Sequence, residues 1–372
     1  MKIWLLPLAV LLAACSRDPQ SDPEYARTCH GSPLRTVEER NAALEEGYTI
    51  NGRFDCIDIH SYEVRQEEMQ LDRAAAEQAA ARRAAQRQVE VDRSLAAERE
   101  GFATEVSLPR TSLDLPAPPA ALFRRYEYDA QRGLVAFVTP DPGDGEKHPA
   151  ILWITGGDCN SLDDFWQEGS PDNEQSASAW RKAGVITMFA TLRGGNASRA
   201  HREAFFGEVD DVRAAGAFLA KLPYVDADRV YLGGHSTGGT LVLLVAESLG
   251  THPGFAGVFA FGAVRSPAVY PPDLMGVDFA ALPDRELRLR SPQYWLEAIR
   301  APTYLIEGAD QPGNSQELDE LCALTRNPAV HCVSVPGKNH FSVLHAVNQV
   351  LAARVAVGED DEPLIKAAQF AR

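Results

Sequence analysis

The feature that most constrains the fold is an alternation of short apolar runs with longer helix-like stretches, beginning near residue 121. Strands that read as continuous apolar runs are buried on both faces, and alternation with helices is typical of a mostly parallel sheet. We therefore predict an α/β fold with a mostly parallel central sheet flanked by helices. Strands are expected at 123–128, 134–139, 151–155, 185–190, 229–233, 256–261, 303–307 and 330–335, and helices around Trp180 and at 208–222, 237–249, 315–325 and 341–355.

One predicted strand-to-helix turn carries the motif Gly234-His235-Ser236-Thr237-Gly238. A chain that turns this sharply holds the serine in a strained conformation, and side chains two positions to either side would clash. The serine then stands at a helix N-terminus, where free N–H groups favour developing negative charge. A glycine-rich helix cap is the alternative interpretation. The apolar strand before the motif and the apolar helix after it favour a nucleophile, and we predict Ser236 in that role.

A serine hydroxyl is a poor nucleophile until a general base removes its proton. His340 follows the predicted strand 330–335 and precedes a predicted helix, so it can reach over the carboxyl edge of the sheet. His345 falls inside that helix, which is more typical of a structural histidine. We therefore predict His340 as the base.

The acid that orients the base is expected on the loop after the strand 303–307. Asp310 lies there and would hold the imidazole in the correct tautomer. It could instead cap the helix that begins near residue 315. Glu307 and Glu317 are the alternative acids.

The strand 151–155 ends in a second glycine-rich turn, Gly156-Gly157-Asp158. We expect the N–H of Gly157 or Asp158 to join that of Thr237 in an oxyanion hole. The alternative interpretation is a plain Gly-Gly turn without a catalytic role. It would form the same loop, and the two differ only in whether a backbone N–H points into the site.

Four stretches together resemble a known superfamily: Arg193-Gly194-Gly195, Glu208–Asp211 leading to Pro223–Asp226, the elbow Arg229–Gly239, and Ser291-Pro292 before Ala301–Gly308. From about 121 to 355 the chain resembles the α/β-hydrolase superfamily. Within it, the chain is most similar to the catalytic domains of prolyl-oligopeptidase-like (S9-type) serine peptidases and to dienelactone-hydrolase-like esterases. The resemblance implies a triad in the order serine, acid, histidine, and hydrolysis through an acyl-enzyme.

The sequence departs from the family pattern in three ways. Thr155 stands where the family often has the histidine of His-Gly-Gly, and Asp310 lies two residues after Gly308 where three are usual. No β-propeller is predicted before the hydrolase segment, so a peptidase assignment rests on analogy. Ester hydrolysis is therefore the leading hypothesis. Cleavage of short peptides is the alternative, and a non-catalytic envelope lipoprotein that uses the fold for binding is a third.

Residues 263–300 lie where such enzymes insert a lid or cap. Arg265, Arg288 and Arg290 could face a substrate carboxylate there, although solvated surface charge is the more usual role of arginine. Arg193 is interpreted as a structural ion-pair residue.

The N-terminus reads as a targeting segment over residues 1–15. A short apolar run ends in Leu12-Ala13-Ala14-Cys15, which resembles the bacterial lipobox whose cysteine is lipidated. Ser16 after the cysteine suggests the outer membrane, and an ordinary signal peptide is the alternative. We then expect a small polar segment (16–61), a long solvated helix (62–100), a proline-rich linker (101–120), the catalytic domain (121–358) and a C-terminal tail (359–372).

Charge and cysteines complete the sequence predictions. A net charge of −16 repels phosphates and disfavours nucleic-acid partners. The sequence has no phosphate-loop, His-Glu-x-x-His or Cys-x-x-Cys motif, so we expect no cofactor and no metal. An exported protein meets oxidising conditions, and Cys322–Cys332 is the first choice of disulfide, with Cys29–Cys56 the second.

Overall fold

The computed structural model describes residues 48–50, 56–58, 95–111, 113–250, 254–359 and 363–370. The chain divides into two compact units, Met1–Gln86 and Arg87–Arg372. In the first unit, β1 (Tyr48–Ile50) pairs antiparallel with β2 (Cys56–Asp58). The predicted lipidation at Cys15, the side chains of the Cys29–Cys56 pair and most of the predicted helix 62–100 lie outside the described residues.

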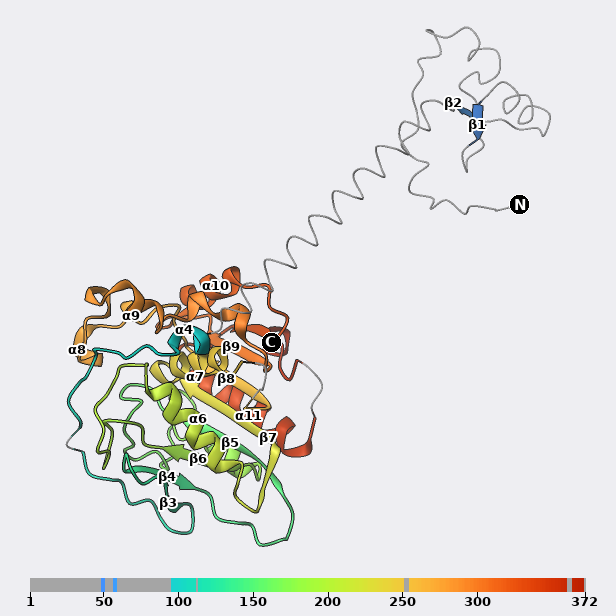
Figure 1. Cartoon of the computed structure of the whole chain (residues 1–372). Helices are drawn as coiled ribbons and strands as arrows, with labels where there is room; N and C mark the ends of the chain where they lie inside the picture. Colours follow the sequence, from blue (N-terminus) through green and yellow to red (C-terminus); the bar gives the residue numbers. More distant parts are fainter. Residues whose placement is uncertain are drawn as a thin grey trace. The chain divides into compact units, whose positions relative to one another are not determined.

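The second unit is built on an eight-stranded sheet, and all eight predicted strands are present (Figure 1). The strand order is β10-β9-β8-β7-β5-β6-β4-β3. The strands β5 to β10 run parallel, whereas β3 and β4 pair antiparallel at one edge. The fold prediction is thereby confirmed. The bounds are β3 (Arg124–Asp129), β4 (Leu134–Val138), β5 (His148–Ile154), β6 (Ile186–Ala190), β7 (Val225–His235), β8 (Gly257–Phe261), β9 (Thr303–Gly308) and β10 (Val330–Val335).

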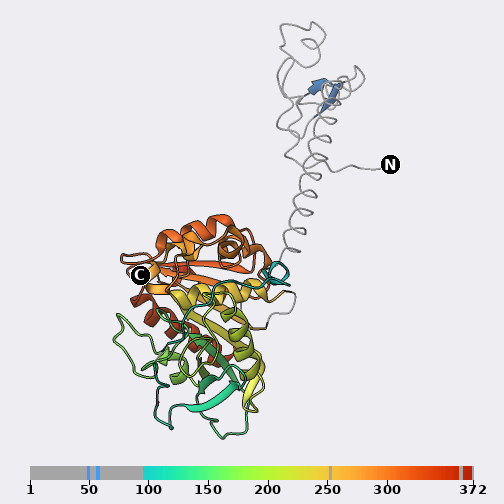
Figure 2. The same ribbon diagram turned by 60° about the vertical axis from the view of Figure 1, so that its left-hand side comes forward.

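Helices cover both faces of the sheet, which Figure 2 shows from a second direction. On one face, α6 (Glu208–Leu219), α7 (Thr237–Ser248) and α10 (Ser315–Leu324) pack on one apolar core. On the other face, α5 (Ser178–Lys182) and α11 (Ser342–Val357) pack on a second core. Adjacent residues of β5 pack into different cores: Leu152 lies in the first core and Trp153 in the second. This explains why the strands read as unbroken apolar runs.

The segment predicted as a cap, between β8 and β9, forms six short helical pieces. They are η2 (Pro267–Val269), α8 (Pro272–Met275), η3 (Phe279–Ala281), α9 (Asp284–Arg288), η4 (Pro292–Tyr294) and η5 (Leu296–Ala298). Phe279 lies 1% exposed and stacks on Phe205, so the cap is packed against the sheet domain.

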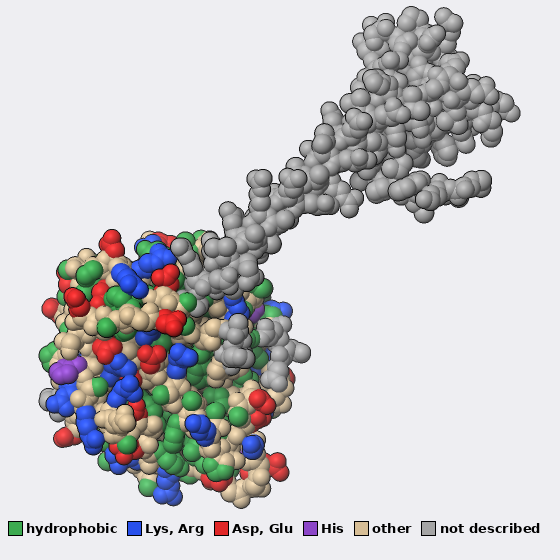
Figure 3. Space-filling view, viewed as in Figure 1, with side chains coloured by type: hydrophobic (Ala, Val, Ile, Leu, Met, Phe, Trp, Pro, Cys, Tyr) green, Lys and Arg blue, Asp and Glu red, His purple; other side chains and the backbone are tan. Residues whose placement is uncertain are grey.

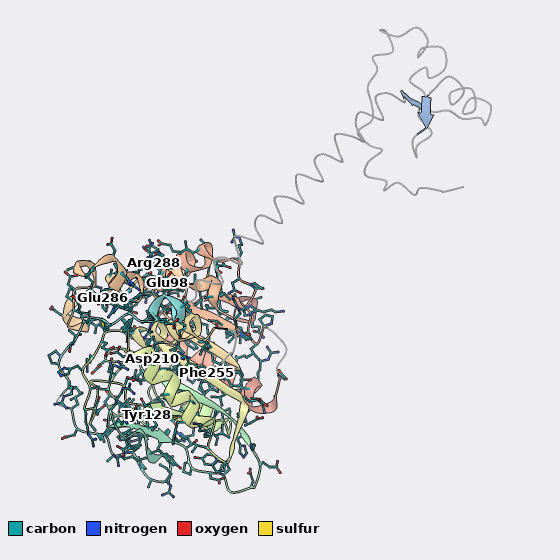
Figure 4. The ribbon with its side chains drawn as sticks, in the orientation of Figure 1. Glu98, Tyr128, Asp210, Phe255, Glu286 and Arg288 are labelled. Carbon is teal, nitrogen blue, oxygen red and sulfur yellow. A yellow bond between two sulfur atoms is a disulfide. The ribbon has the colours of Figure 1, made fainter. Side chains whose placement is uncertain are left out.

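Residues 95–111, which the sequence assigns to the end of the solvated helix and to the linker, pack on the second unit. Leu95 in α4 (Leu95–Arg99) is fully buried in the first core. Leu108 forms an isolated antiparallel bridge with Arg202. Thr104 donates a hydrogen bond to Glu286 of α9, and Figure 4 shows Glu286 on the same side of the domain as Glu98 of α4. This strap, residues 95–111, is therefore part of the domain.

The C-terminal tail also packs on the domain. Leu364 and Ile365 are buried in the second core, and the Leu364 amide donates to the Tyr304 hydroxyl at 2.7 Å. A disulfide joins Cys322 to Cys332, the pair that the sequence favours, across the turn from α10 to β10. Cys159 is a free, buried thiol.

The surface of the domain is mixed in charge. On the face drawn in Figure 3, acidic and basic side chains are interspersed among apolar and neutral ones. Among the described residues, no helix has both the length and the apolar character needed to cross a membrane.

Candidate active site

The turn from β7 into α7 holds Ser236 in a conformation that side chains rarely adopt, with φ 57° and ψ −116°. Its amide donates to the Phe261 carbonyl of β8 at 2.8 Å, which fixes the turn to the neighbouring strand. A Cβ on Gly234 would lie 2.5 Å from the Gly238 carbonyl oxygen, and one on Gly238 would lie 2.4 Å from that of Ile154. Both glycines are therefore required by close contacts, and Ser236 stands partly exposed at the helix start.

The first turn of α7 and the loop after β5 lie together. The Thr237 hydroxyl donates to the Gly157 carbonyl at 2.9 Å. Gly157 has φ 68°, the left-handed region that glycine adopts freely. Among the described residues, the amides of Thr237, Gly157 and Asp158 donate to no protein acceptor. Unused donors beside a strained serine can stabilise an oxyanion, and the sequence predicts these residues for that role.

His340 follows β10 and contacts a buried carboxylate. Its Nδ1 lies 2.8 Å from Oε2 of Glu307, the next-to-last residue of β9. The Glu307 side chain is 1% exposed and that of His340 11%. Glu307 Oε1 accepts from the Gly308 amide at 2.8 Å, so both carboxylate oxygens have partners. An acceptor at Nδ1 directs the second ring nitrogen, Nε2, to act as the base.

The glycine that follows β8, the strand beside β9, makes room for this pair. Gly262 follows β8 and has φ 63°. A Cβ there would lie 2.4 Å from His340 Cε1 and 3.0 Å from Glu307 Oε2. The imidazole therefore sits directly on the backbone that follows Phe261, whose carbonyl binds the Ser236 amide. Ser236, Glu307 and His340 thus gather at the carboxyl edge of three parallel strands.

The carboxylate beside His340 is not the one that we preferred from the sequence. The Asp310 side chain is exposed, and its amide donates to the Lys338 carbonyl at 2.8 Å. Glu317, the other alternative, accepts from the amide of Arg265 at 2.9 Å. Glu307 is therefore the acid that the geometry supports. Its longer side chain reaches the histidine from the strand itself, one residue before the strand ends.

His235, for which the sequence motif predicts no role, lies beside His340. The two rings have centroids 4.5 Å apart, and His235 Nε2 lies 2.9 Å from the His340 carbonyl oxygen. A carbonyl only accepts, so Nε2 carries the proton and Nδ1 is bare. Burial lowers the pKa of His235 to about 3, and nearby His340 adds to the lowering. The ring is therefore neutral at physiological pH.

The four arginines considered from the sequence have structural partners. Arg193 binds Asp211 through Nε and Nη2, each at 2.9 Å, and pairs with Glu203 at 2.8 Å, as its predicted structural role requires. Arg290 is fully buried, and its Nε donates to the Ala204 carbonyl at 2.7 Å. Arg265 pairs with Glu317 and Glu320, and the Arg288 guanidinium lies over the rings of Tyr294 and Trp295.

A small pocket opens beside the loop after β5. It is bordered by that loop, by Arg202, by the strap and by the cap helix α8. Arg202 Nη2 lies 2.6 Å from Asp158 Oδ2, so the two charges on the pocket wall neutralise each other. The lining residues are Leu108, Gly157, Asp158, Cys159, Asn160, Arg202, Ala204, Leu274 and Met275. No group of His, Cys, Asp and Glu suited to a metal occurs within the described part of the chain.

Comparison with known proteins supports the same class of enzyme. Residues 171–264, which include Ser236 and the turn around it, match the family model described as the prolyl oligopeptidase family. The chain is a serine hydrolase of the α/β-hydrolase fold. The comparison of this hydrolase with curated proteins finds no match.

Several solved structures are similar to the hydrolase. A puromycin hydrolase is 19% identical with a TM-score of 0.48, covering 63% of this chain and 39% of that one. A puromycin-hydrolysing peptidase of Mycobacterium tuberculosis is 18% identical with a TM-score of 0.48, covering 66% and 40%. An esterase of Thermogutta terrifontis is 18% identical with a TM-score of 0.46, covering 65% and 95%. The hydrolase thus spans well under half the length of the puromycin-hydrolysing structures.

Proposed function

We propose that the hydrolase cleaves a carboxylic ester through an acyl-enzyme on Ser236, with His340 as base and Glu307 as the orienting acid. The observation that carries the proposal is the 2.8 Å contact between His340 Nδ1 and Glu307 beside the strained serine. Amide bonds of short peptides are the second substrate class, favoured by the match of residues 171–264 to a peptidase family.

The first half of the reaction forms the acyl-enzyme. Ser236 Oγ attacks the substrate carbonyl carbon while His340 Nε2 takes the hydroxyl proton. The carbonyl oxygen becomes an oxyanion, which the free amides of Thr237 and of Gly157 or Asp158 stabilise. The bond to the leaving group then breaks, and the protonated His340 gives its proton to the departing alcohol or amine. Glu307 stabilises the imidazolium throughout.

The second half regenerates the serine. A water molecule gives a proton to His340 and its oxygen attacks the acyl carbon. The ester bond to Ser236 breaks, the acid product leaves, and Ser236 recovers its proton from His340. We propose that the pocket beside Asp158 receives a small uncharged group of the substrate. Its apolar walls, among them Leu274 and Met275, and the neutral Arg202–Asp158 pair favour such a group.

The test uses the full chain and a fluorophosphonate probe, which reacts with activated serines. We expect the wild type to be labelled and Ser236→Ala to remain unlabelled. A folded wild type without label would refute the enzyme mechanism and leave a binding role for the fold. A panel of nitrophenyl esters and aminoacyl nitroanilides then separates the two substrate classes. Turnover of the anilides alone would refute the ester assignment.

We further propose that the enzyme is held at the cell envelope by a lipid on Cys15. The lipobox-like end of the apolar run at residues 3–14 supports this, and Ser16 favours the outer membrane. The substrate would then be a small ester or short peptide of the periplasm.

A further inference from the structure

We propose that His235 is a positioning residue whose ring holds two loops in place. The first is the base loop, which follows β10 and carries His340. The second is the oxyanion loop, which follows β5 and carries Gly157 and Asp158. The inference rests on the proposed hydrolytic function. His235 lies between Gly234 and Ser236 in the elbow and is 2% exposed. His235 takes no part in the proposed catalytic steps, yet its ring contacts both the base loop and the oxyanion loop.

The contact to the base loop is a hydrogen bond. His235 Nε2 donates to the His340 carbonyl at 2.9 Å, and the two rings pack at 4.5 Å. Phe341 adds an edge contact to the same ring at 5.9 Å. The loop that carries the base is therefore fixed at its backbone by the residue next to the nucleophile. A displacement of this carbonyl would move the His340 side chain relative to Ser236.

The contact to the oxyanion loop is close packing. A Cβ on Gly156 would lie 3.0 Å from His235 Nδ1, so the backbone before Gly157 lies against the ring. Nδ1 is buried and has no hydrogen-bond partner among the described residues. A bare nitrogen left in an apolar contact lowers stability, because a buried polar atom without a partner is unfavourable. A phenyl ring would fill this space without that penalty, which indicates that the imidazole serves its Nε2 donor.

The test compares three substitutions that separate the donor from the ring. In His235→Gln the side-chain amide reaches about as far as Nε2 and can still donate to the His340 carbonyl. In His235→Asn the amide reaches only as far as Nδ1. In His235→Phe the ring remains and the donor is lost. The measurements are kcat and KM on an ester, the rate of fluorophosphonate labelling, and circular dichroism of the full chain.

We expect the asparagine and phenylalanine variants to lose roughly ten- to hundredfold in kcat, since a misplaced base costs this much. KM should stay within about twofold, because the donor does not touch the substrate. The glutamine variant should restore most of kcat, which a purely structural role would not require.

Two results would overturn the inference: phenylalanine and asparagine variants with kcat near that of the wild type, or a glutamine variant as impaired as asparagine. If the asparagine and phenylalanine variants do not fold, the glutamine variant decides alone, and a tenfold loss of kcat in it counts against the inference. A wild type that is not labelled would instead refute the proposed function itself, so the two failures are distinguishable.

Discussion

The sharpest prediction concerns the acid of the triad. Glu307 and Asp310 both lie near the end of β9, and substituting them should have opposite effects on activity. In Glu307→Gln the amide oxygen can still accept from the Gly308 amide, which now binds Oε1. The amide NH₂ then faces His340 Nδ1, which must become an acceptor, so the proton moves to Nε2. Nε2 is the atom that should take the Ser236 proton. The variant thus keeps the shape of the site and blocks the base.

The size of the effect follows from charge and tautomer together. Opposite unit charges 4 Å apart attract by about 4 kcal/mol at the effective dielectric typical of proteins. Loss of that attraction in the transition state lowers the rate by about 10³-fold. The wrong tautomer adds to this, and the corresponding change in the best-studied triad costs about 10⁴-fold. We therefore expect kcat of Glu307→Gln to fall by about 10³- to 10⁴-fold.

Asp310→Asn is the matched control. Its side chain is exposed, and the backbone contact of its amide with Lys338 survives the substitution. We expect kcat within about twofold of the wild type, as for surface substitutions in general. Steady-state kinetics on a nitrophenyl ester measures both variants, and circular dichroism checks the fold. An inactive Asp310→Asn beside an active Glu307→Gln would refute the assignment of the acid.

Three further predictions concern stability and targeting. Burial raises the pKa of Glu247 well above its usual value, and both its oxygens lack partners within the described residues, so the folded state is penalised as pH rises above the ordinary glutamate range. Glu247→Leu should stabilise the protein by about 1–3 kcal/mol at neutral pH in urea unfolding, with less gain at pH 5, and an equal gain at both would contradict the reasoning. Replacing Cys322 and Cys332 by serine should lower the unfolding free energy by about 3 kcal/mol in urea unfolding, and reducing agent should abolish this difference from the wild type. A difference of the same size under reducing conditions would contradict a role of the disulfide. Palmitate labelling of cells should mark the wild type and not Cys15→Ala, and label in both would exclude this lipid site.

The sheet could be predicted from sequence because its strands are buried on both faces. Ile151, Leu152 and Trp153 are all apolar since alternate residues face two different cores. Such a run carries its burial in its composition and needs no knowledge of distant contacts. The turn around Ser236 could also be predicted from local sequence. Its glycines are required because a Cβ there would clash with backbone atoms of the same turn and of the adjacent strand.

The acid was harder to predict, because its contact with His340 joins residues that are distant in the sequence and depends on the folded structure. Asp310 has the loop position that the family pattern favours, whereas Glu307 looks like the polar end of a buried strand. A charged residue inside a continuous apolar run must nevertheless find a partner, since a buried charge without one is costly. The apolar run from Thr303 to Gly308 contains such a charged residue, Glu307. This feature favours Glu307 over Asp310 as the acid.

Arg290 differs from its expected surface role because its contacts, too, depend on residues distant in the sequence. Two of its hydrogen-bond partners, Thr104 and Ala204, lie far away in the sequence, so nothing near Arg290 announces its burial. Arginine is seldom fully buried, and the usual expectation of a surface role failed here. Arg193, which was interpreted as an ion-pair residue, has that role with Asp211.

The strap sets where the protein can be cut. Composition places the boundary of the catalytic domain among the prolines near residue 116. A fragment that begins at residue 101 contains all of the domain predicted in this way. Such a fragment lacks Leu95, which is fully buried, and Arg99, which donates to the Phe206 carbonyl. It would expose the apolar surface that Leu95 covers, and it would release the start of the segment whose Leu108 lines the pocket. Loss of activity in that fragment would therefore say nothing about the triad, and a shortened enzyme should keep α4.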